Sequence, residues 1–324
     1  MAMANKRRGS LALTGVMAAL MVLLGAAELR AVALSAPRVL LVVAHPDDEY
    51  YCAATVYRIA QELGGTVDQV VVTNGEGGFH YTQLAEKFYG VALADEQSRH
   101  ARLPDIRKSE VLRAGGILGI RRHYFLDQHD DGFTLDPRET LERLWERDRV
   151  LKFLAARLAE ERYNFVFVVL PRWETHGQHK AATLLALEAI SRMAPEVRPI
   201  VLAAEPGLLD DPAARFEGVV GYRLSRPASA TPVLQFDRTK SFGYHNALRY
   251  EIVVNWVIAE HKSQGLFQND CNRHDVERFW LFTENLDGAL GRVRGLDRML
   301  SGQLTGESIH PIEETTAVSI GAAR

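Results

Sequence analysis

Five short apolar runs recur along the chain and alternate with segments that predict helices. The apolar runs predict strands at residues 39–43, 69–73, 123–126, 165–170 and 199–203. The segments between or beside them predict helices at about residues 49–63, 104–118, 138–161 and 177–193. Strands that alternate with helices form a mostly parallel, doubly wound sheet. The pattern therefore predicts an α/β, Rossmann-like fold with helices on both faces of the sheet.

Three other segments depart from this alternation. Residues 76–104 form a long polar connection, which we interpret as a lid or a wall of the substrate site because connections of that length are usually functional or mobile. Residues 217–236 predict additional β-structure, and residues 246–264 predict an amphipathic helix. The expected fold thus carries C-terminal β/α additions.

The first 35 residues have the pattern of an export signal. The basic triplet 6–8 precedes an uncharged apolar stretch at 11–27, and small residues follow near 26–33. The apolar stretch is close to the lower length limit for a membrane span, so an uncleaved anchor is the alternative. We expect residues 1–35 to be a signal peptide or anchor, 36–302 the folded domain and 303–324 a polar, loosely ordered tail. The protein is expected to be exported, periplasmic or secreted, or otherwise membrane-anchored.

Composition narrows the classes of partner. The chain is 47% hydrophobic and 24% charged, with a net charge of −3, and without residues 1–35 the net charge is −6. A mildly acidic domain argues against a nucleic-acid partner. Cys52 and Cys271 could pair in an exported protein, but a small buried thiol is the interpretation that we favour for Cys52.

Polar side chains follow the first apolar run directly. The sequence His-Pro-Asp-Asp-Glu occupies positions 45–49, at the carboxyl end of the predicted first strand, where open α/β sheets place their ligand sites. His45 and Asp48 can share one divalent ion, and Asp47 then lies beside it as a base. The alternative is an acidic helix N-terminus that complements the helix dipole.

Two histidines follow the fourth predicted strand in the same way. His176 and His179 lie three positions apart at the start of the helix predicted over 177–193, and hence on one face of it. Together the two strand ends supply His, Asp and His. Three protein ligands with one open position are how catalytic zinc is held.

These motifs resemble those of the PIG-L (LmbE-like) zinc-dependent de-N-acetylase superfamily. The resemblance covers residues 38–270 and rests mainly on residues 45–49 and on the His pair. Supporting matches are Thr-Asn-Gly-Glu-Gly-Gly at 73–78, Arg107-x-x-Glu110 with Leu118-Gly119, Asp131-Gly132 and the late segment 259–264. Many members have Pro-Asp between the two histidines, whereas this chain has Gly177-Gln178. Gln178 cannot act as a carboxylate.

The residues and the resemblance lead to the same set of roles. One zinc ion per chain is held by His45, Asp48 and His179 and keeps a water in its open position. Asp47 takes the proton of that water, and His176 donates to the oxyanion or protonates the leaving amine.

Four further residues are candidates for binding substrate. Arg107 could hold a hydroxyl or an anionic group or else form a surface ion pair with Glu110, and Glu76 could hold a sugar hydroxyl. Asp131 could belong to the rim of the pocket or to a solvated loop. His261 could lie behind the site or simply end its helix.

The export signal and the site motifs, with what the resemblance implies about activity and substrate, predict an exported zinc-dependent deacetylase that hydrolyses the N-acetyl amide of an N-acetylglucosamine-type sugar or glycoconjugate. Two alternatives remain open at this point. One is a zinc amidase acting on a non-sugar amide of the thiol-conjugate type, and the other is an inactive carbohydrate-binding homologue. The expected partner is a small-molecule or glycan substrate.

Overall fold

The computed structural model of the chain describes residues 36–303 except 94, 266–272 and 286. The predicted N-terminal signal or anchor and nearly all of the predicted tail lie outside the described residues. So does Cys271, and the question of its pairing with Cys52 stays open.

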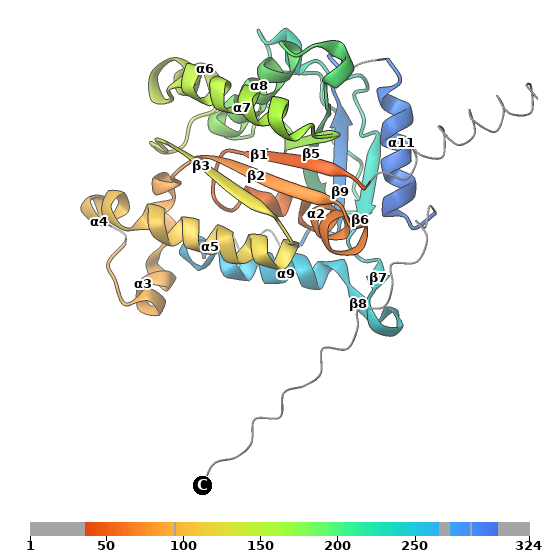
Figure 1. Cartoon of the computed structure of the whole chain (residues 1–324). Helices are drawn as coiled ribbons and strands as arrows, with labels where there is room; N and C mark the ends of the chain where they lie inside the picture. The colour runs from red at the N-terminus through yellow and green to blue at the C-terminus, as the bar shows by residue number, and fades with distance from the viewer. Residues whose placement is uncertain (1–35, 94, 266–272, 286, 304–324) are drawn as a thin grey trace, which may run out of the picture. The chain divides into compact units, whose positions relative to one another are not determined.

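A seven-stranded sheet lies at the centre of the described residues (Figure 1). Its strand order is β3-β2-β1-β4-β5-β9-β6, and the first five of these strands are parallel, while β9 is antiparallel to both of its neighbours. This confirms the predicted Rossmann-like α/β fold. The strands, with a separate two-stranded pair formed by β7 and β8, are β1 (Arg38–Val43), β2 (Thr66–Thr73), β3 (Arg122–Gln128), β4 (Phe165–Val169), β5 (Ile200–Gly207), β6 (Leu234–Asp237), β7 (Ser241–Phe242), β8 (Leu248–Arg249) and β9 (Val276–Leu281).

Helices cover both faces of the sheet. In Figure 1, α2, α5 and α9 lie on one face, and α7 and α8 lie on the other. None of the helices in the described part of the chain is long and apolar enough to cross a membrane. The helices are α2 (Ala53–Tyr57), α3 (Gln83–Tyr89), α4 (Glu96–Ala101), α5 (Leu103–Leu118), α6 (Pro137–Glu139), α7 (Arg147–Glu161), α8 (Gly177–Ser191), α9 (Tyr250–Glu260) and α11 (Ala289–Leu300). Shorter 3₁₀ turns occupy Asp48–Cys52, Glu76–Tyr81, Pro195–Val197, Arg223–Ser225, Tyr244–Asn246 and Lys262–Gln264, and π-turns occupy Arg58–Glu62 and Thr140–Leu144.

The continuous apolar runs are explained by burial on both faces of the central strands. Along β1, Leu41 and Val43 belong to the core beneath α2, α5 and α9, whereas Leu40 and Val42 belong to the core beneath α7 and α8. Because successive side chains of a strand point to opposite faces, a strand covered on both sides must be apolar at every position.

The structure contradicts one predicted segment and adds detail to two others. The helix predicted over residues 138–161 is broken, because Trp145 adopts extended dihedral angles between α6 with its π-turn and α7. Trp145 is buried, and its Nε1 donates to the carbonyl oxygen of His129 at 3.0 Å. The segment 76–104 contains the short helices α3 and α4, and in 217–236 the structure has the beginning of β6 and a bridge between Pro227 and Phe282.

The strand order places the ends of β1 and β4 side by side. The chain runs outward from β1 through β2 to β3 and then returns to form β4 on the other side of β1. Val42 of β1 pairs with Val168 of β4, so both strands end at the same edge of the sheet. Such a reversal of strand order is where open α/β sheets bind ligands.

Candidate active site

The loop that follows β1 is folded back by one of its own carboxylates. Oδ2 of Asp48 accepts hydrogen bonds from the backbone N–H groups of Ala44 at 3.0 Å and His45 at 2.8 Å. Its other oxygen, Oδ1, lies 3.0 Å from Nε2 of His179 on α8. The two oxygens therefore have separate tasks, since one holds the loop and the other faces the partner histidine.

The loop that follows β4 is fixed by the start of α8. His176 caps this helix, because its Nδ1 accepts the backbone N–H of Gln178 at 3.0 Å. The next residue, Gly177, donates its N–H to the carbonyl oxygen of Thr134 at 2.6 Å, and a Cβ at this position would lie 2.9 Å from the carbonyl oxygen of Asp136. A glycine is therefore required for the helix to approach this loop so closely.

The three predicted metal ligands lie together at this edge of the sheet. Nδ1 of His45 is 2.9 Å from Nε2 of His179 and 3.5 Å from Oδ2 of Asp48. The ligand atoms of a tetrahedral zinc site with bonds of 2.0–2.1 Å are about 3.3 Å apart. Two imidazole nitrogens and a carboxylate that converge at such distances fit a divalent cation, which His45, Asp48 and His179 would hold.

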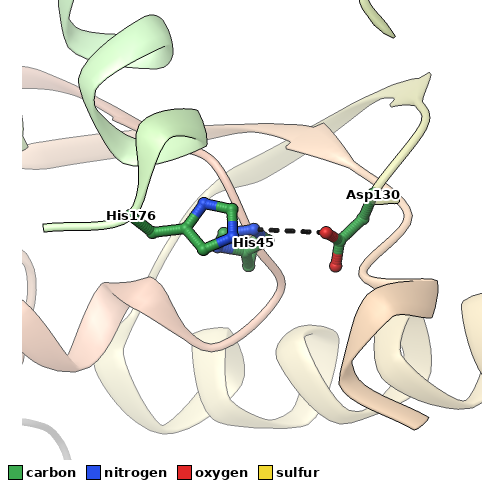
Figure 2. A group of neighbouring side chains, drawn as sticks. All are labelled: His45, Asp130 and His176. Atoms are coloured by element: carbon green, nitrogen blue, oxygen red, sulfur yellow. Dashed lines mark ion pairs between the residues drawn. The ribbon is translucent and has the colours of Figure 1, made fainter. Parts of the chain in front are cut away.

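A second grouping shares His45 but faces its other ring nitrogen. Oε1 of Gln178 lies 3.0 Å from Nε2 of His45, and Oδ1 of Asp130 lies 3.8 Å from the same nitrogen. Figure 2 shows the Asp130 carboxylate directed at the His45 ring, with His176 beside that ring. Because Gln178 accepts from Nε2, the proton of the neutral ring is on Nε2 and the lone pair of Nδ1 faces Asp48 and His179. A cation bound by His45 would therefore lie on its Nδ1 side, and Gln178 and Asp130 would orient the ring.

The electrostatics of the site favour a positive charge beside Asp48 and Asp130. Burial lowers the pKa of His45, but the carboxylates of Asp130 and Asp48 outweigh it and raise that pKa to about 9. Burial acts to raise the pKa of Asp48, and His179 and His45 outweigh it, so this pKa lies well below its usual range. The surroundings are thus suited to a cation.

Asp47 is held next to the ligands by a buried arginine. Oδ2 of Asp47 lies 2.8 Å from Nη2 of Arg107, whose Nη1 donates to the carbonyl oxygen of Gly75 at 2.6 Å. Gly75 has a φ of +72°, and a Cβ there would lie 2.5 Å from Nη1 of Arg107. Burial raises the pKa of Asp47 against the opposing effect of Arg107. The predicted base is therefore fixed in orientation, and its affinity for a proton is increased.

The alternative of a surface pair between Arg107 and Glu110 is wrong. Arg107 is buried and lies against Asp47, and Glu110 is also buried. Glu110 accepts hydrogen bonds from Ser263 and from the hydroxyl of Tyr89. The acidic-cap interpretation of residues 45–49 does not explain Asp47 and Asp48. The carboxylate of Asp47 makes no cap hydrogen bond and contacts Arg107, and that of Asp48 accepts from the backbone that precedes it.

Both ring nitrogens of His176 have partners. Nδ1 accepts from Gln178, and Nε2 lies 3.1 Å from the carbonyl oxygen of Gly132, to which it donates. Burial, together with the nearby His45 and His179, lowers the pKa of His176 to about 3. The ring is therefore neutral near pH 7 and carries its proton on Nε2.

The four predicted substrate residues divide into two pairs. Arg107 and Asp131 line the cavity at the site. Glu76 does not line it, in contrast to the prediction. His261 does not line it either, and it ends α9 and lies behind the site, as the sequence interpretations of this residue had it. Glu76 is buried with Oε1 3.1 Å from Nδ1 of His129. His261 is fully buried and its Nε2 lies 2.5 Å from Oε1 of Glu49. The side chains of Glu76 and His261 are therefore buried, and the sequence pattern does not indicate this burial.

A cavity of about 840 Å³ opens over these residues. The predicted wall 76–104 contributes residues 77–81 to its lining. Sequence reasoning missed the roles of Gln178, which orients His45, and of several lining residues, namely Tyr51, Phe133, Arg172, Glu174, Glu205 and Gln264. For Arg172, Glu174 and Glu205 a signal was available, because they follow or end strands β4 and β5 at the same edge of the sheet.

Comparison with known proteins points to one family. A family model described as GlcNAc-PI de-N-acetylase (PIG-L) matches residues 40–190, which include both loops of the site. Over these residues the chain is similar to the PIG-L family. The match confirms the resemblance that the motifs carry. The family model and the curated relative are both named as deacetylases, which is the enzyme class that the sequence predicts.

The proteins that this chain is similar to carry different names. The probable N-acetyl-alpha-D-glucosaminyl L-malate deacetylase 2 of Bacillus cereus is 28% identical over 165 residues, which are 51% of this chain and 66% of that protein. GalB, the 4-carboxy-2-hydroxymuconate hydratase of Pseudomonas putida KT2440, is 18% identical with a TM-score of 0.50 over 76% of this chain and 95% of its own. The N,N'-diacetylchitobiose deacetylase of Pyrococcus horikoshii is 20% identical with a TM-score of 0.45 over 71% of each chain. Because a hydratase shares the fold, the activity has to be argued from the site.

Proposed function

We propose that this chain is a zinc-dependent deacetylase that hydrolyses the N-acetyl amide of an N-acetylglucosamine-type sugar or glycoconjugate. The observation that carries the proposal is the convergence of His45, Asp48 and His179 beside Asp47, inside the residues that the family model matches. A bound zinc ion supplies Lewis acidity, which polarises the amide carbonyl and makes a water molecule a stronger acid.

Asp47 is the proton carrier of the proposed reaction. Its carboxylate takes a proton from the water whose oxygen bonds to the amide carbon. The C–N bond then breaks, and the same proton passes to the leaving nitrogen, so that the products are acetate and a free amine. The raised pKa of Asp47 suits a group that must both accept and return a proton, and Arg107 holds one of its oxygens in place.

His176 has the role of a hydrogen-bond donor to the carbonyl oxygen as negative charge develops on it. Of the two roles considered from the sequence, the lowered pKa supports this one, because a neutral ring with a very weakly basic nitrogen is a poor source of a full proton near pH 7. Its Nε2–H, now directed at Gly132, is the donor.

The first test separates metal binding from proton transfer. We expect about one zinc per purified chain and release of acetate from a panel of N-acetylated sugars. Asp48→Asn and His179→Ala should lose zinc, because they remove ligands. Asp47→Asn should keep zinc and lower turnover by roughly 10²–10⁴-fold, the range that general base catalysis supplies. Metal analysis and acetate release are measured on the same preparations.

The outcomes discriminate among the alternatives. Unchanged zinc content in His179→Ala would exclude the metal site. Full activity in Asp47→Asn would exclude Asp47 as the base. Acetate release from thiol conjugates but from none of the sugars would favour the non-sugar amidase, and binding of sugars without any release of acetate would favour the inactive carbohydrate-binding protein.

We further propose that the protein is exported. The support is the basic triplet at 6–8 followed by the uncharged apolar stretch at 11–27. Mass spectrometry of protein from an export-competent host should show an N-terminus within residues 26–36. An intact Met1 on membrane-bound protein would indicate the anchor instead, and intact protein in the cytoplasm would refute export.

A further inference from the structure

The charges around the cavity are strongly unbalanced. Among the described lining residues there are two guanidinium groups, Arg107 and Arg172, and six carboxylates, of Asp47, Asp48, Asp130, Asp131, Glu174 and Glu205. Arg107 lies against Asp47 at 2.8 Å. One divalent cation would offset two of the carboxylates, and the rest of the lining would stay acidic.

Arg172, the second guanidinium group of the lining, is already neutralised by two carboxylates. Its Nη1 lies 2.9 Å from Oε1 of Glu205, and its Nη2 contacts the carboxylate of Glu174. Glu205 comes from β5 and the other two residues from the segment after β4, so the group is built across two neighbouring strands. An anionic ligand group would therefore meet a guanidinium whose charge two carboxylates already offset.

Aromatic side chains lie at and next to the cavity with their rings exposed. Phe133 and Tyr81 line it and are 75% and 45% exposed. Trp173, between the lining residues Arg172 and Glu174, is 79% exposed, and its carbonyl oxygen accepts from Nζ of Lys180 at 2.7 Å, which fixes its backbone against α8. Exposed apolar surface of this kind marks ligand grooves. The C–H faces of pyranose rings can pack on such rings, as other apolar groups do.

We propose that the cavity selects an uncharged oligosaccharide or glycoside of N-acetylglucosamine, whose neighbouring sugar rings lie against Phe133, Tyr81 and Trp173, over conjugates in which the attached group is anionic. The proposal rests on the deacetylase function proposed above. The cavity has a volume of about 840 Å³, toward the upper end of the range for small-molecule sites, about 300–1,000 Å³. This volume leaves room beyond one sugar ring. The relative from Bacillus cereus is named for an acidic malate conjugate, so this chain would differ from it in substrate charge.

Matched substrates test the charge preference. We expect kcat/KM for N,N'-diacetylchitobiose to exceed that for N-acetylglucosamine 1-phosphate and for N-acetylglucosaminyl malate by at least tenfold. Raising the ionic strength should increase kcat/KM for the two anionic substrates, because salt screens their repulsion by the cavity. It should leave kcat/KM for the neutral substrate unchanged. Equal or better turnover of an anionic substrate at low salt would overturn the proposal.

Variants locate the preference. In the Glu174→Gln, Glu205→Gln double variant Arg172 is released, and the ratio of anionic to neutral kcat/KM should rise several-fold. The matched control is Glu284→Gln, which loses an ion pair with Arg223 outside the cavity and should leave the ratio unchanged. Trp173→Ala should raise KM for the disaccharide and leave its kcat unchanged. Neither KM nor kcat should change for methyl N-acetylglucosaminide. An unchanged ratio in the double variant would refute the role of Arg172.

A binding experiment separates this inference from the proposed activity. Calorimetry on the zinc-loaded protein compares cellobiose with cellobiouronic acid, which keeps both sugar rings, differs in charge and carries no acetyl group. Tighter binding of cellobiose without acetate release from any substrate would overturn the deacetylase and leave the charge preference standing. Acetate release with equal binding of the two ligands would overturn the charge preference alone.

Discussion

The ring of His45 is held from both sides by chemically different groups. On the Nδ1 side are Asp48 and His179, and on the Nε2 side are Gln178 and Asp130. The amide oxygen of Gln178 accepts a hydrogen bond from Nε2–H of His45, as a carboxylate would. Gln178 can therefore orient the ring without a charge. Asp130 supplies negative charge from another loop. The departure from Pro-Asp is thereby compensated in the structure.

Replacement of Gln178 tests this orienting role. Gln178→Leu removes the acceptor for Nε2 of His45 while keeping a similar volume, and we expect zinc affinity to fall by about 10–100-fold. Gln178→Glu keeps an acceptor oxygen at the same reach and should hold affinity within tenfold of the original. Competition with a chelating dye measures both. Wild-type affinity in the leucine variant would show that Gln178 does not orient the ligand.

His176 combines a structural and a proposed catalytic task, which two substitutions can separate. Asn is a good helix cap and retains an acceptor for the N–H of Gln178, so His176→Asn should fold as stably as the original chain. It should still lower turnover by about 10²–10³-fold, the usual effect of losing a donor to an oxyanion.

His176→Ala should lose turnover similarly and also about 1 kcal/mol of stability with the cap. Urea unfolding and acetate release measure the two effects. If His176→Asn retains full turnover, the ring serves only as a cap.

The site could be predicted from the sequence to the extent that its residues follow strands. His45, Asp48, His176 and His179 could be placed together because parallel strands share an edge for their carboxyl ends. Gln178 and Asp130 were not assigned to His45, since their contact depends on ring orientation and on a loop path. The sequence also could not predict whether Glu76 and His261 face the cavity or the core. Polar residues that face a cavity and polar residues that face a core occur in similar loops.

At the scale of elements, a buried acid on β9 holds the helix that follows the metal loop. Glu277 accepts the backbone N–H groups of Ala54 and Thr55 at 2.8 and 2.9 Å, at the start of α2. It also binds Nε of Arg238 at 3.0 Å, and Nη2 of Arg238 donates to the carbonyl oxygen of Tyr50. Both ionic side chains are fully buried. A C-terminal strand thus fixes the first helix from behind.

Glu277→Ala should therefore be strongly destabilising. It leaves Arg238 charged and buried without its carboxylate, and we expect a loss of about 3–5 kcal/mol in the free energy of unfolding. The control is Glu284→Ala, whose ion pair with the exposed Arg223 should contribute about 0–1 kcal/mol. Urea unfolding compares them. A loss under 1 kcal/mol in Glu277→Ala would contradict this account.

Elements that the sequence predicts well are those whose burial is uniform. The run at 39–43 corresponds to β1, because both faces of that strand are covered and every position is apolar. The strand β9 was missed, since Glu277 and Arg278 interrupt its apolar pattern and their partners lie far away in sequence. The break at Trp145 has a similar cause, because its contact with His129 overrides a pattern typical of one continuous helix.

At the scale of the whole molecule, metal binding is linked to pH through His45. In the metal-free protein its pKa is raised to about 9, above the value of 6.5 for an unperturbed histidine. Its contribution to the stability of the metal-free fold is therefore fully present below about pH 6.5 and is lost as the pH rises through about 9.

Zinc must displace the same proton, since a ligand nitrogen needs its lone pair. Below about pH 9 we expect apparent zinc affinity to rise about tenfold per pH unit, with roughly one proton released per zinc bound. Calorimetry in buffers of different ionisation enthalpy counts that proton. A pH-independent affinity between pH 6 and 8 would contradict the raised pKa.

The separation of the two halves of the site along the chain ties the metal to completion of folding. His45 and His179 are 134 positions apart, and they meet only after β4 has inserted against β1. A chain folded no further than β3 would hold two of the three proposed ligands and would bind zinc weakly. The proposed zinc would therefore bind the finished fold, which it would stabilise by about 4 kcal/mol when free zinc exceeds its dissociation constant about 1,000-fold. Where zinc is scarce, the protein would lose lifetime together with activity.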